Sequence, residues 1–180
     1  MIIGLTGANA SGKGEAAEYL KSKGFEYYSL SDILREEARV KGIEPSRENL
    51  IMLGNKLRRE KGLSILAELA IKKIKDKRNY IIDSVRSPFE IKALRQLKGF
   101  TLIGIDAPVE TRFNRILSRN RAGDPGTLED FIEKERKENI SADTNQQLEN
   151  CLKLADKIII NDSTIEEFHK RIYEVIKKTA

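Results

Sequence analysis

Short apolar runs alternate with longer amphipathic stretches along the chain. The runs are rich in isoleucine, and each precedes a segment whose apolar residues recur every three or four positions. This alternation is typical of βαβ units, in which helices cover both faces of a parallel sheet. The runs that predict strands are Ile2 to Leu5, Phe25 to Tyr28, Tyr80 to Ile82, Leu102 to Ile105 and Ile158 to Ile160. The pattern therefore predicts a three-layer α/β/α fold around a five-stranded parallel sheet.

The segment between the second and third predicted strands is too long for one crossover helix. Its apolar pattern predicts three helices instead, over residues 31–41, 46–60 and 64–77. We expect these helices, in residues 31–77 as a whole, to form a flap at the edge of the sheet. A second insertion, residues 119–137, interrupts the unit between the fourth and fifth strands and is expected to form a short lid. Such insertions are typical of enzymes that close over their substrates.

Composition narrows the range of possible chemistry. The chain has 180 residues, of which 39% are hydrophobic, so residues 1–180 are expected to form a single domain with one core. One Cys and one His exclude a disulfide within the chain and a Cys/His zinc site. Cys151 shares an apolar helix face with Leu148 and Leu152, which predicts a core position. The reaction is therefore expected to use Lys, Arg, carboxylates, hydroxyls and backbone amides.

The surface is expected to be charged and of mixed sign. The formal net charge is +5, and 34% of the residues are charged. No apolar run approaches the roughly 20 residues that a bilayer requires, and no secretory signal is visible at the N-terminus. These features predict a cytoplasmic protein without a membrane partner.

The strongest local motif lies directly after the first predicted strand and before a helical stretch. A strand, a Gly-rich loop and a helix in this order point backbone N–H groups and the positive end of a helix dipole at one place. The motif therefore predicts a site for a polyphosphate, with Lys13 at the terminal phosphates. The alternative is a Gly-rich turn with a surface lysine, but a lysine in a first helical turn is unfavourable without an anion. The residues expected to bind the nucleotide are Gly7, Ala8, Asn9, Ala10, Ser11, Gly12, Lys13, Gly14 and the following Glu15.

Gly12-Lys13-Gly14 resembles the Gly-Lys-Gly-Thr motif of kinases of the adenylate kinase type. Gly14 stands where most phosphate loops have a Ser or Thr that contacts Mg²⁺, a departure that this family shares. The resemblance ends at Glu15, where a carboxylate replaces a hydroxyl, and the alternative role of Glu15 is a favourable charge at the helix N-terminus. The resemblance implies a P-loop nucleoside monophosphate kinase that uses ATP and Mg²⁺.

Two further segments resemble acceptor-binding elements of that family. Asp32 to Arg35 is similar to the segment Gly-Asp-Met-Leu-Arg, which implies that both residues contact the acceptor and that Arg35 holds its phosphate. Asp83 to Arg86 is similar to Asp-Gly-Phe-Pro-Arg with one residue fewer, which implies that Arg86 also holds this phosphate. The alternative for Arg35 is an exposed charge paired with a neighbouring glutamate.

Asp83 follows two apolar strand residues, at the carboxyl edge where open α/β sheets bind ligands. A carboxylate at this edge is suited to hold Mg²⁺ through water, so Asp83 is the expected metal ligand. The alternative is a turn residue that caps the next helix.

Arginines recur on the helix after the fourth predicted strand. Arg112, Arg115 and Arg119 have the spacing i, i+3, i+7 and so share one face. Arg115 to Arg119 resembles the Arg-Ile-x-Gly-Arg sequence at the lid hinge of adenylate kinases, which implies that both arginines contact the donor nucleotide. A solvated basic face is the alternative. Arg136 is expected to return from the lid as an acceptor ligand, or else belongs to an ordinary run of alternating charge.

The last predicted strand ends in a loop with Asn161, which is expected beside the donor base. This strand and loop are similar to the end of dephospho-CoA kinases, and so is the opening Gly4-Leu5-Thr6-Gly7. In a dephospho-CoA kinase the acceptor is a sugar hydroxyl, for which Asp32 is the available base. The spacing from Asp32 to Arg35 favours a monophosphate acceptor.

Phosphoryl transfer needs cationic groups around the transferred phosphate more than it needs a general base. The sequence therefore predicts ATP-dependent transfer to a nucleoside monophosphate or a similar small nucleotide. The residues with expected catalytic roles are Lys13, Asp83, Arg115 and Arg119.

A third possibility is a slow nucleotide-dependent switch that acts through an RNA or protein partner. Its contact surface would be a basic cluster formed by Arg58, Arg59 and residues 72–78. Tyr80 is the one aromatic residue near this cluster, so base stacking is poorly provided for and nucleic acid is not the expected partner.

Overall fold

The computed structural model describes residues 1–75, 78–120, 123–138 and 147–179. All strand pairs are parallel, and the strand order is β2-β3-β1-β4-β5. The strands are β1 (Ile2–Thr6), β2 (Glu26–Ser29), β3 (Tyr80–Asp83), β4 (Phe100–Asp106) and β5 (Lys157–Ile160). The predicted fold, a five-stranded parallel sheet between helical layers, is confirmed.

Nine helices lie within the described residues. Several begin at a serine whose hydroxyl accepts a hydrogen bond from a backbone N–H of the first turn, as Ser29, Ser46 and Ser87 do. The helices are α1 (Lys13–Ser22), α2 (Leu30–Val40), α3 (Arg47–Lys61), α4 (Ile65–Ile71), α5 (Pro88–Leu94), α6 (Val109–Arg119), α7 (Leu128–Glu138), α8 (Leu148–Lys153) and α9 (Ile165–Thr179).

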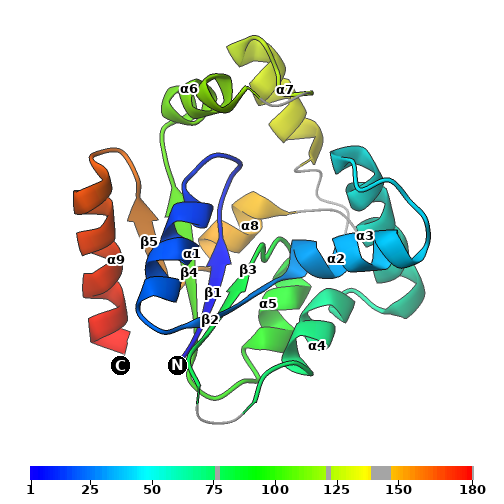
Figure 1. Cartoon of the computed structure of the whole chain (residues 1–180), viewed down its shortest axis with the longest axis horizontal. Helices are drawn as coiled ribbons and strands as arrows, with labels where there is room; N and C mark the ends of the chain where they lie inside the picture. The colour runs from blue at the N-terminus through cyan, green and yellow to red at the C-terminus, as the bar shows by residue number, and fades with distance from the viewer. Residues whose placement is uncertain (76–77, 121–122, 139–146, 180) are drawn as a thin grey trace.

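The central strands are buried on both faces because two hydrophobic clusters sandwich the sheet, whereas the edge strand β5 leaves Ile158 and Ile160 exposed. Alternate residues of a strand point to opposite faces, so Ile3 and Ile81 pack with residues of α1 and α9. Ile2 and Ile82 pack on the other face with residues of the remaining core helices, including Cys151 of α8, which is fully buried as predicted. In Figure 1, α9 lies at one end of the sheet, and α2, α3 and α4 lie at the other.

Three helices separate β2 from β3, as the apolar pattern predicts. α2, α3 and α4 pack on one another, and α4 packs on α5. The third of them is shorter than expected: α4 ends at Ile71, and residues 76–77 of the predicted helix lie outside the described residues. The chain has to turn back toward β3 here, and the Tyr80 hydroxyl fixes this turn by hydrogen bonds to the backbone N–H and carbonyl of Lys75.

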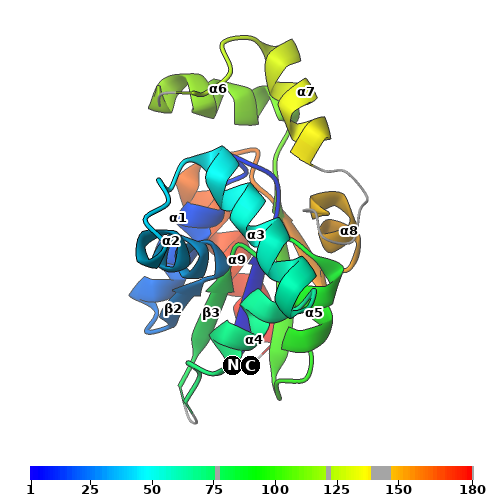
Figure 2. The same ribbon diagram turned by 90° about the vertical axis from the view of Figure 1, so that its right-hand side faces the viewer.

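The predicted lid corresponds to the junction of α6 and α7, which lie above the rest of the molecule in Figure 2. α6 ends at Arg119 and is followed by Asn120, which adopts the left-handed φ of 43°. Residues 121–122 of the predicted lid lie outside the described residues. α7 follows Thr127, whose hydroxyl accepts a hydrogen bond from the Asp130 N–H at 3.1 Å. None of the helices in the described part of the chain combines the length and apolar character that a membrane span requires.

Candidate functional site

The loop between β1 and α1 has a backbone conformation that requires glycine at two positions. Gly7 and Gly12 have φ values of 144° and 107°, and a Cβ at either position would lie 2.0 Å from the Ile105 carbonyl oxygen or 2.1 Å from Asn161 Nδ2. Such conformations are open to glycine and strained for other residues. The loop therefore curls tightly around the N-terminal end of α1, the geometry in which backbone N–H groups bind phosphate.

Lys13 is the first residue of α1, and its side chain bends back over the loop. Its Nζ donates hydrogen bonds to the carbonyls of Gly7 and Ala8, each at 2.7 Å. Burial, together with the charges of Arg86 and Arg112, lowers the pKa of Lys13 from 10.5 to about 8. The ammonium group thus lies where positive charge is already concentrated, which is a setting that favours a bound anion.

Three side chains support the loop from its outer side. Arg115 donates to the carbonyls of Ala10 and Asn161 at 3.2 and 3.1 Å, and Asn161 Nδ2 donates to the Ser11 carbonyl at 2.9 Å. Arg112 is buried and donates to the carbonyls of Asn9 and Ala107. Arg115 and Asn161, both predicted site residues, therefore shape the loop through its backbone. Arg112, which the sequence places on the same helix face as Arg115, does so as well.

Asp83 lies at the carboxyl end of β3, where the sequence places it, and is 7% exposed. One carboxylate oxygen accepts a hydrogen bond from the Tyr27 hydroxyl at 2.9 Å, and the other accepts from the Ser84 N–H. These contacts fix the orientation of the carboxylate, and its charge raises the pKa of Lys13 in opposition to the effect of burial. Ser84 adopts a φ of 63°, which is uncommon for a residue with a side chain.

Glu15 pairs with a residue of α9. Its Oε1 lies 2.7 Å from Nε2 of His169 in α9, and the His169 ring stacks on Tyr19 with the ring centroids 4.4 Å apart. The sequence predicts Glu15 among the nucleotide-binding residues, but the structure pairs it with a neighbouring helix. The contact with His169 was not predicted, because the two residues are far apart in the sequence.

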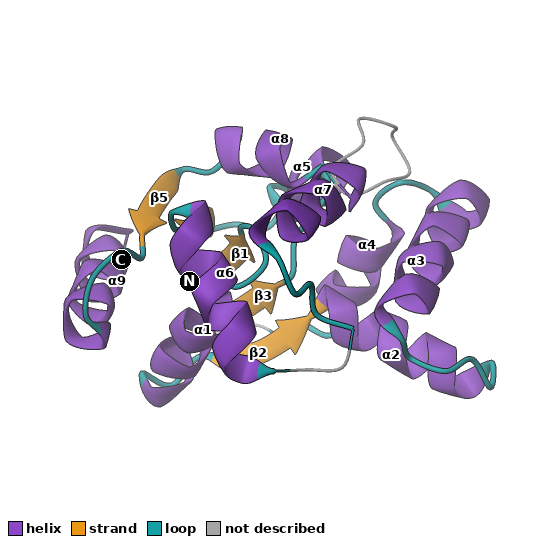
Figure 3. Ribbon diagram, turned by 90° about the horizontal axis from the view of Figure 1, so that it is seen from above, coloured by secondary structure: helices purple, strands orange, loops and turns teal. Residues whose placement is uncertain are grey.

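A cleft of about 410 Å³ opens in front of the phosphate loop. Figure 3, seen from above, shows α6 and α7 over the centre of the molecule, with α2, α3 and α4 to one side. Side chains of both helical groups line the cleft, together with Gly7 and Asn9 of the loop. The acidic residues of this lining are Glu48 and Asp124. The cationic residues are Lys13, Arg35, Arg47, Arg58, Arg86, Arg119 and Lys134.

The cleft brings together some of the predicted residues and leaves others outside. Lys13, Arg35, Arg86 and Arg119 all line it. Asp32 is more than half exposed and forms an ion pair with Arg35. The Arg136 side chain is 83% exposed and lies near Glu133 of its own helix.

Sequence reasoning missed three cationic residues of the cleft. Arg47 and Arg58 come from α3, and Lys134 comes from α7. Arg58 is 4% exposed, which corrects its assignment to a solvated basic cluster. Lys77 of that cluster lies outside the described residues. The available signal was the position of Arg58 one residue after Leu57, on the apolar side of a helix that also buries Leu53 and Gly54.

Comparisons with known proteins identify the fold and the domain family of this chain. Residues 6–133 match the family model described as an AAA domain. The structure of TT1252 from Thermus thermophilus superposes with a TM-score of 0.60 at 20% identity, over 100% of this chain and 98% of that chain. Shikimate kinase from Aquifex aeolicus gives a TM-score of 0.53 at 19% identity, over 99% and 97%. The chain thus contains this AAA domain and has the P-loop fold of these structures, as its motifs imply.

Full-length relatives define the family more closely. A UPF0200 protein from Methanoregula boonei is 33% identical over 97% of this chain and 95% of its own length. The UPF0200 protein of Pyrococcus abyssi is 34% identical over 99% and 96%. The chain belongs to the UPF0200 family.

Proposed function

We propose that the protein transfers the γ-phosphoryl group of ATP to a nucleoside monophosphate or a similar small nucleotide. The observation that carries this proposal is the charge of the cleft, whose lining has seven cationic side chains and two acidic ones. Phosphoryl transfer between two phosphates gathers negative charge from donor, acceptor and transferred group at one place. Cationic groups from several elements are the arrangement that stabilises such charge.

The carboxylates of the cleft favour a phosphate acceptor over a hydroxyl acceptor. A hydroxyl needs a base within hydrogen-bond reach. Asp124 accepts two hydrogen bonds from Arg119, at 2.8 and 2.9 Å, and Glu48 is exposed at the start of α3. Asp32, the base that a dephospho-CoA kinase would use, is paired with Arg35. A phosphate acceptor is already an anion and needs no base, so the lining fits a monophosphate better.

Most of the predicted residues have a role under this proposal. Lys13 neutralises the transferred phosphoryl group, and the backbone of residues 7–14 binds the donor phosphates. Arg35 and Arg86 hold the acceptor phosphate, with Arg136 approaching only after movement of α7. Arg119 adds charge from the lid, while Arg115 and Asn161 fix the loop on its donor side.

Asp83 fits the requirements of a magnesium site. Mg²⁺ in such enzymes is held by one or two carboxylates together with water and substrate phosphates, and Asp83 is a carboxylate close enough to Lys13 to affect its pKa. The ion would neutralise phosphate charge in the transition state. Gly14 offers no hydroxyl to the ion, so Asp83 is the ligand that we propose from this chain.

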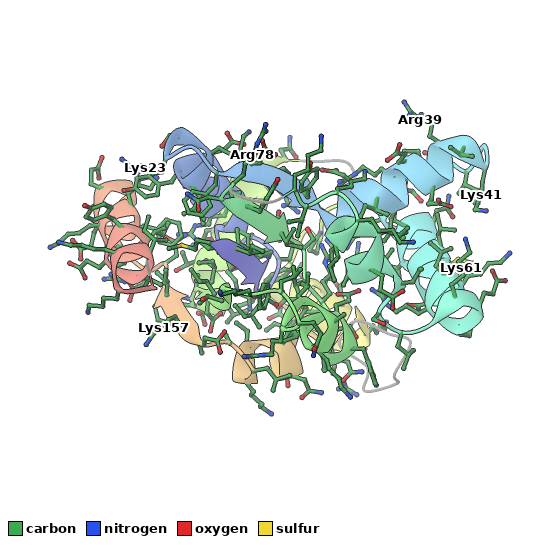
Figure 4. The ribbon with its side chains drawn as sticks, turned by 90° about the horizontal axis from the view of Figure 1, so that it is seen from below. Lys23, Arg39, Lys41, Lys61, Arg78 and Lys157 are labelled. Carbon is green, nitrogen blue, oxygen red and sulfur yellow. The ribbon has the colours of Figure 1, made fainter. Side chains whose placement is uncertain are left out.

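The RNA-dependent alternative has less support. Figure 4 shows basic side chains such as Lys23, Arg78 and Lys157 projecting from widely separated elements. Arg78 forms an ion pair with Glu26, and Arg58 is buried. The exposed positive charge is therefore distributed around the molecule, whereas a nucleic-acid site gathers it on one face.

The proposal is tested by ADP formation from ATP and Mg²⁺, with each ribo- and deoxynucleoside monophosphate and dephospho-CoA added singly. We expect one monophosphate to stimulate turnover. Lys13→Met should lower kcat by about 100-fold or more, because the transferred charge loses its counter-charge. Lys23→Met removes an exposed charge at the far end of the same helix and should leave kcat unchanged.

Two outcomes would contradict the proposal. Stimulation by dephospho-CoA alone would assign a hydroxyl acceptor. If ADP formation never exceeds the rate of ATP hydrolysis with any acceptor, the protein is not a kinase of this kind and the partner-dependent switch becomes the better account.

A further inference from the structure

A buried ion pair joins the helical flap to the body of the molecule. Nη2 of Arg58, in α3, donates to Oε1 of Glu90, in α5, at 2.9 Å. The two side chains are 4% and 1% exposed. Charged groups this deeply buried are unfavourable unless they are paired and hydrogen-bonded. The pair therefore fixes the position of α3 relative to α5.

The second oxygen of the Glu90 carboxylate contacts the loop that follows β3. Glu90 Oε2 accepts a hydrogen bond from the backbone N–H of Arg86, at 2.9 Å. Glu90 thus contacts two residues of different elements, Arg58 by its side chain and Arg86 by its backbone. Both of these residues line the cleft in front of the phosphate loop.

We propose that Glu90 is a positioning residue for acceptor recognition and that Arg58, which it orients, is a further ligand of the acceptor's anionic group. The inference rests on the proposed function, because it assigns these residues to the acceptor side of that reaction. The carboxylate of Glu90 offsets one of the two positive charges of Arg58 and Arg86. These three residues together therefore keep a net positive charge at the cleft. An arginine that is fixed in advance loses little rotamer freedom when it binds an oxyanion.

The neighbouring Gly54 agrees with this assignment. It lies in the middle of α3, where glycine is less favourable than alanine. A Cβ there would lie 3.3 Å from Arg58 Nη1 and 3.3 Å from Leu34 Cδ1. The glycine leaves space for the Arg58 guanidinium at the wall of the cleft, which Gly54 and Leu34 also line.

The test compares Glu90→Gln with Glu174→Gln, a substitution of an exposed glutamate in α9, in the ADP-formation assay with the best monophosphate acceptor. Glu90→Gln should raise the acceptor KM at least 10-fold, with the ATP KM and kcat within about 3-fold of wild type. Glu174→Gln should change none of these. An equal loss for both substrates, or an unchanged acceptor KM, would overturn the inference.

A double variant separates recognition from folding. Arg58→Met with Glu90→Gln removes both buried charges, and such neutral replacements often fold well where a single unpaired charge does not. We expect the double variant to unfold at a midpoint close to wild type and to keep the raised acceptor KM. If both stability and acceptor KM return to wild type, the pair is purely structural. If wild-type protein shows no acceptor-dependent turnover, the proposed function itself fails, which is a different result.

Discussion

The Lys13 side chain is buried and lies close to two other cationic side chains. Its Nζ contacts two loop carbonyls, and Arg86 and Arg112 act with burial to lower its pKa to about 8. A bound polyphosphate would reverse the balance, because an adjacent anion favours the protonated amine. The charge state of this one side chain is therefore coupled to nucleotide binding.

This coupling predicts proton uptake on ATP binding at mildly alkaline pH. Below pH 7 Lys13 is already protonated in the free protein and takes up no proton. Above pH 8 it is largely neutral and has to gain one, so uptake should rise between pH 7 and 9, and ATP affinity should fall. Calorimetric titration in two buffers of different ionisation enthalpy measures the uptake. Lys13→Met should abolish the rise, and a rise that persists in this variant would assign it to another group.

Residues whose role depends on local sequence could be predicted, and those that depend on tertiary packing could not. The positions of Gly7, Gly12 and Lys13 follow from a strand-loop-helix motif within a few residues. Arg58 is buried because α3 packs against α2 and α4, and nothing next to it in the sequence indicates its partner Glu90 in α5. The contact between Glu15 and His169 was missed for the same reason.

At the scale of elements, α7 is attached to α6 mainly through one aromatic side chain. Phe131 is 1% exposed, and its ring centroid lies 6.0 Å from that of Phe113. The Arg112 guanidinium lies over the Phe131 ring and also forms an ion pair with Glu135. Arg112 in turn donates to the Asn9 carbonyl, so the same group of side chains connects α7 to the phosphate loop.

Phe131→Ala should therefore release α7 while the sheet stays folded. Hydrogen exchange followed by mass spectrometry is expected to show faster exchange in residues 128–138 and unchanged exchange in α9, because the contacts of Phe131 lie at the junction of α6 and α7. Ile132→Ala is the matched control, since Ile132 is 46% exposed on the same helix. Equal effects of the two substitutions would mean that Phe131 is not the attachment point.

The elements themselves were largely predictable from periodicity. Every predicted strand is present, because a buried parallel strand has a compact apolar run as its signature. The end of α4 was placed too late, since Lys72, Lys73 and Ile74 continue a helical pattern while the return to β3 forces a turn. Periodicity reports which faces are apolar, and chain reversal is decided by contacts such as that of Tyr80 with Lys75.

For the molecule as a whole, the two helical groups that flank the cleft carry charges of the same sign. Arg35, Arg47 and Arg58 lie on the side of α2 and α3, and Arg119 and Lys134 lie on the side of α6 and α7. Asp32, Glu90 and Asp124 offset part of this charge, and the lining still has more cationic than acidic side chains. An anion that binds between the two groups would attract both of them and favour their approach.

A small polyanion without base or sugar should therefore stabilise the protein. Inorganic pyrophosphate at about 100 times its Kd would contribute about 2.7 kcal/mol to the free energy of unfolding, which raises Tm by about 5–10 °C for a chain of this length. Added NaCl should reduce the shift by screening. Thermal unfolding in pyrophosphate, compared with NaCl of equal ionic strength, measures it, and equal midpoints in the two salts would contradict a polyanion site.

The position of β1 has a consequence for biosynthesis. β1 lies at the centre of the sheet, where Ile2 is level with Tyr80 of β3 on one side and Phe100 of β4 on the other. A ribosome releases β1 long before β3 or β4. The strand that carries the phosphate loop therefore has no neighbouring strand to pair with while β3 and β4 are translated. Nucleotide in the cell therefore cannot assist folding before β3 and β4 are made, because until then the strand that carries the phosphate loop lacks both of its neighbours.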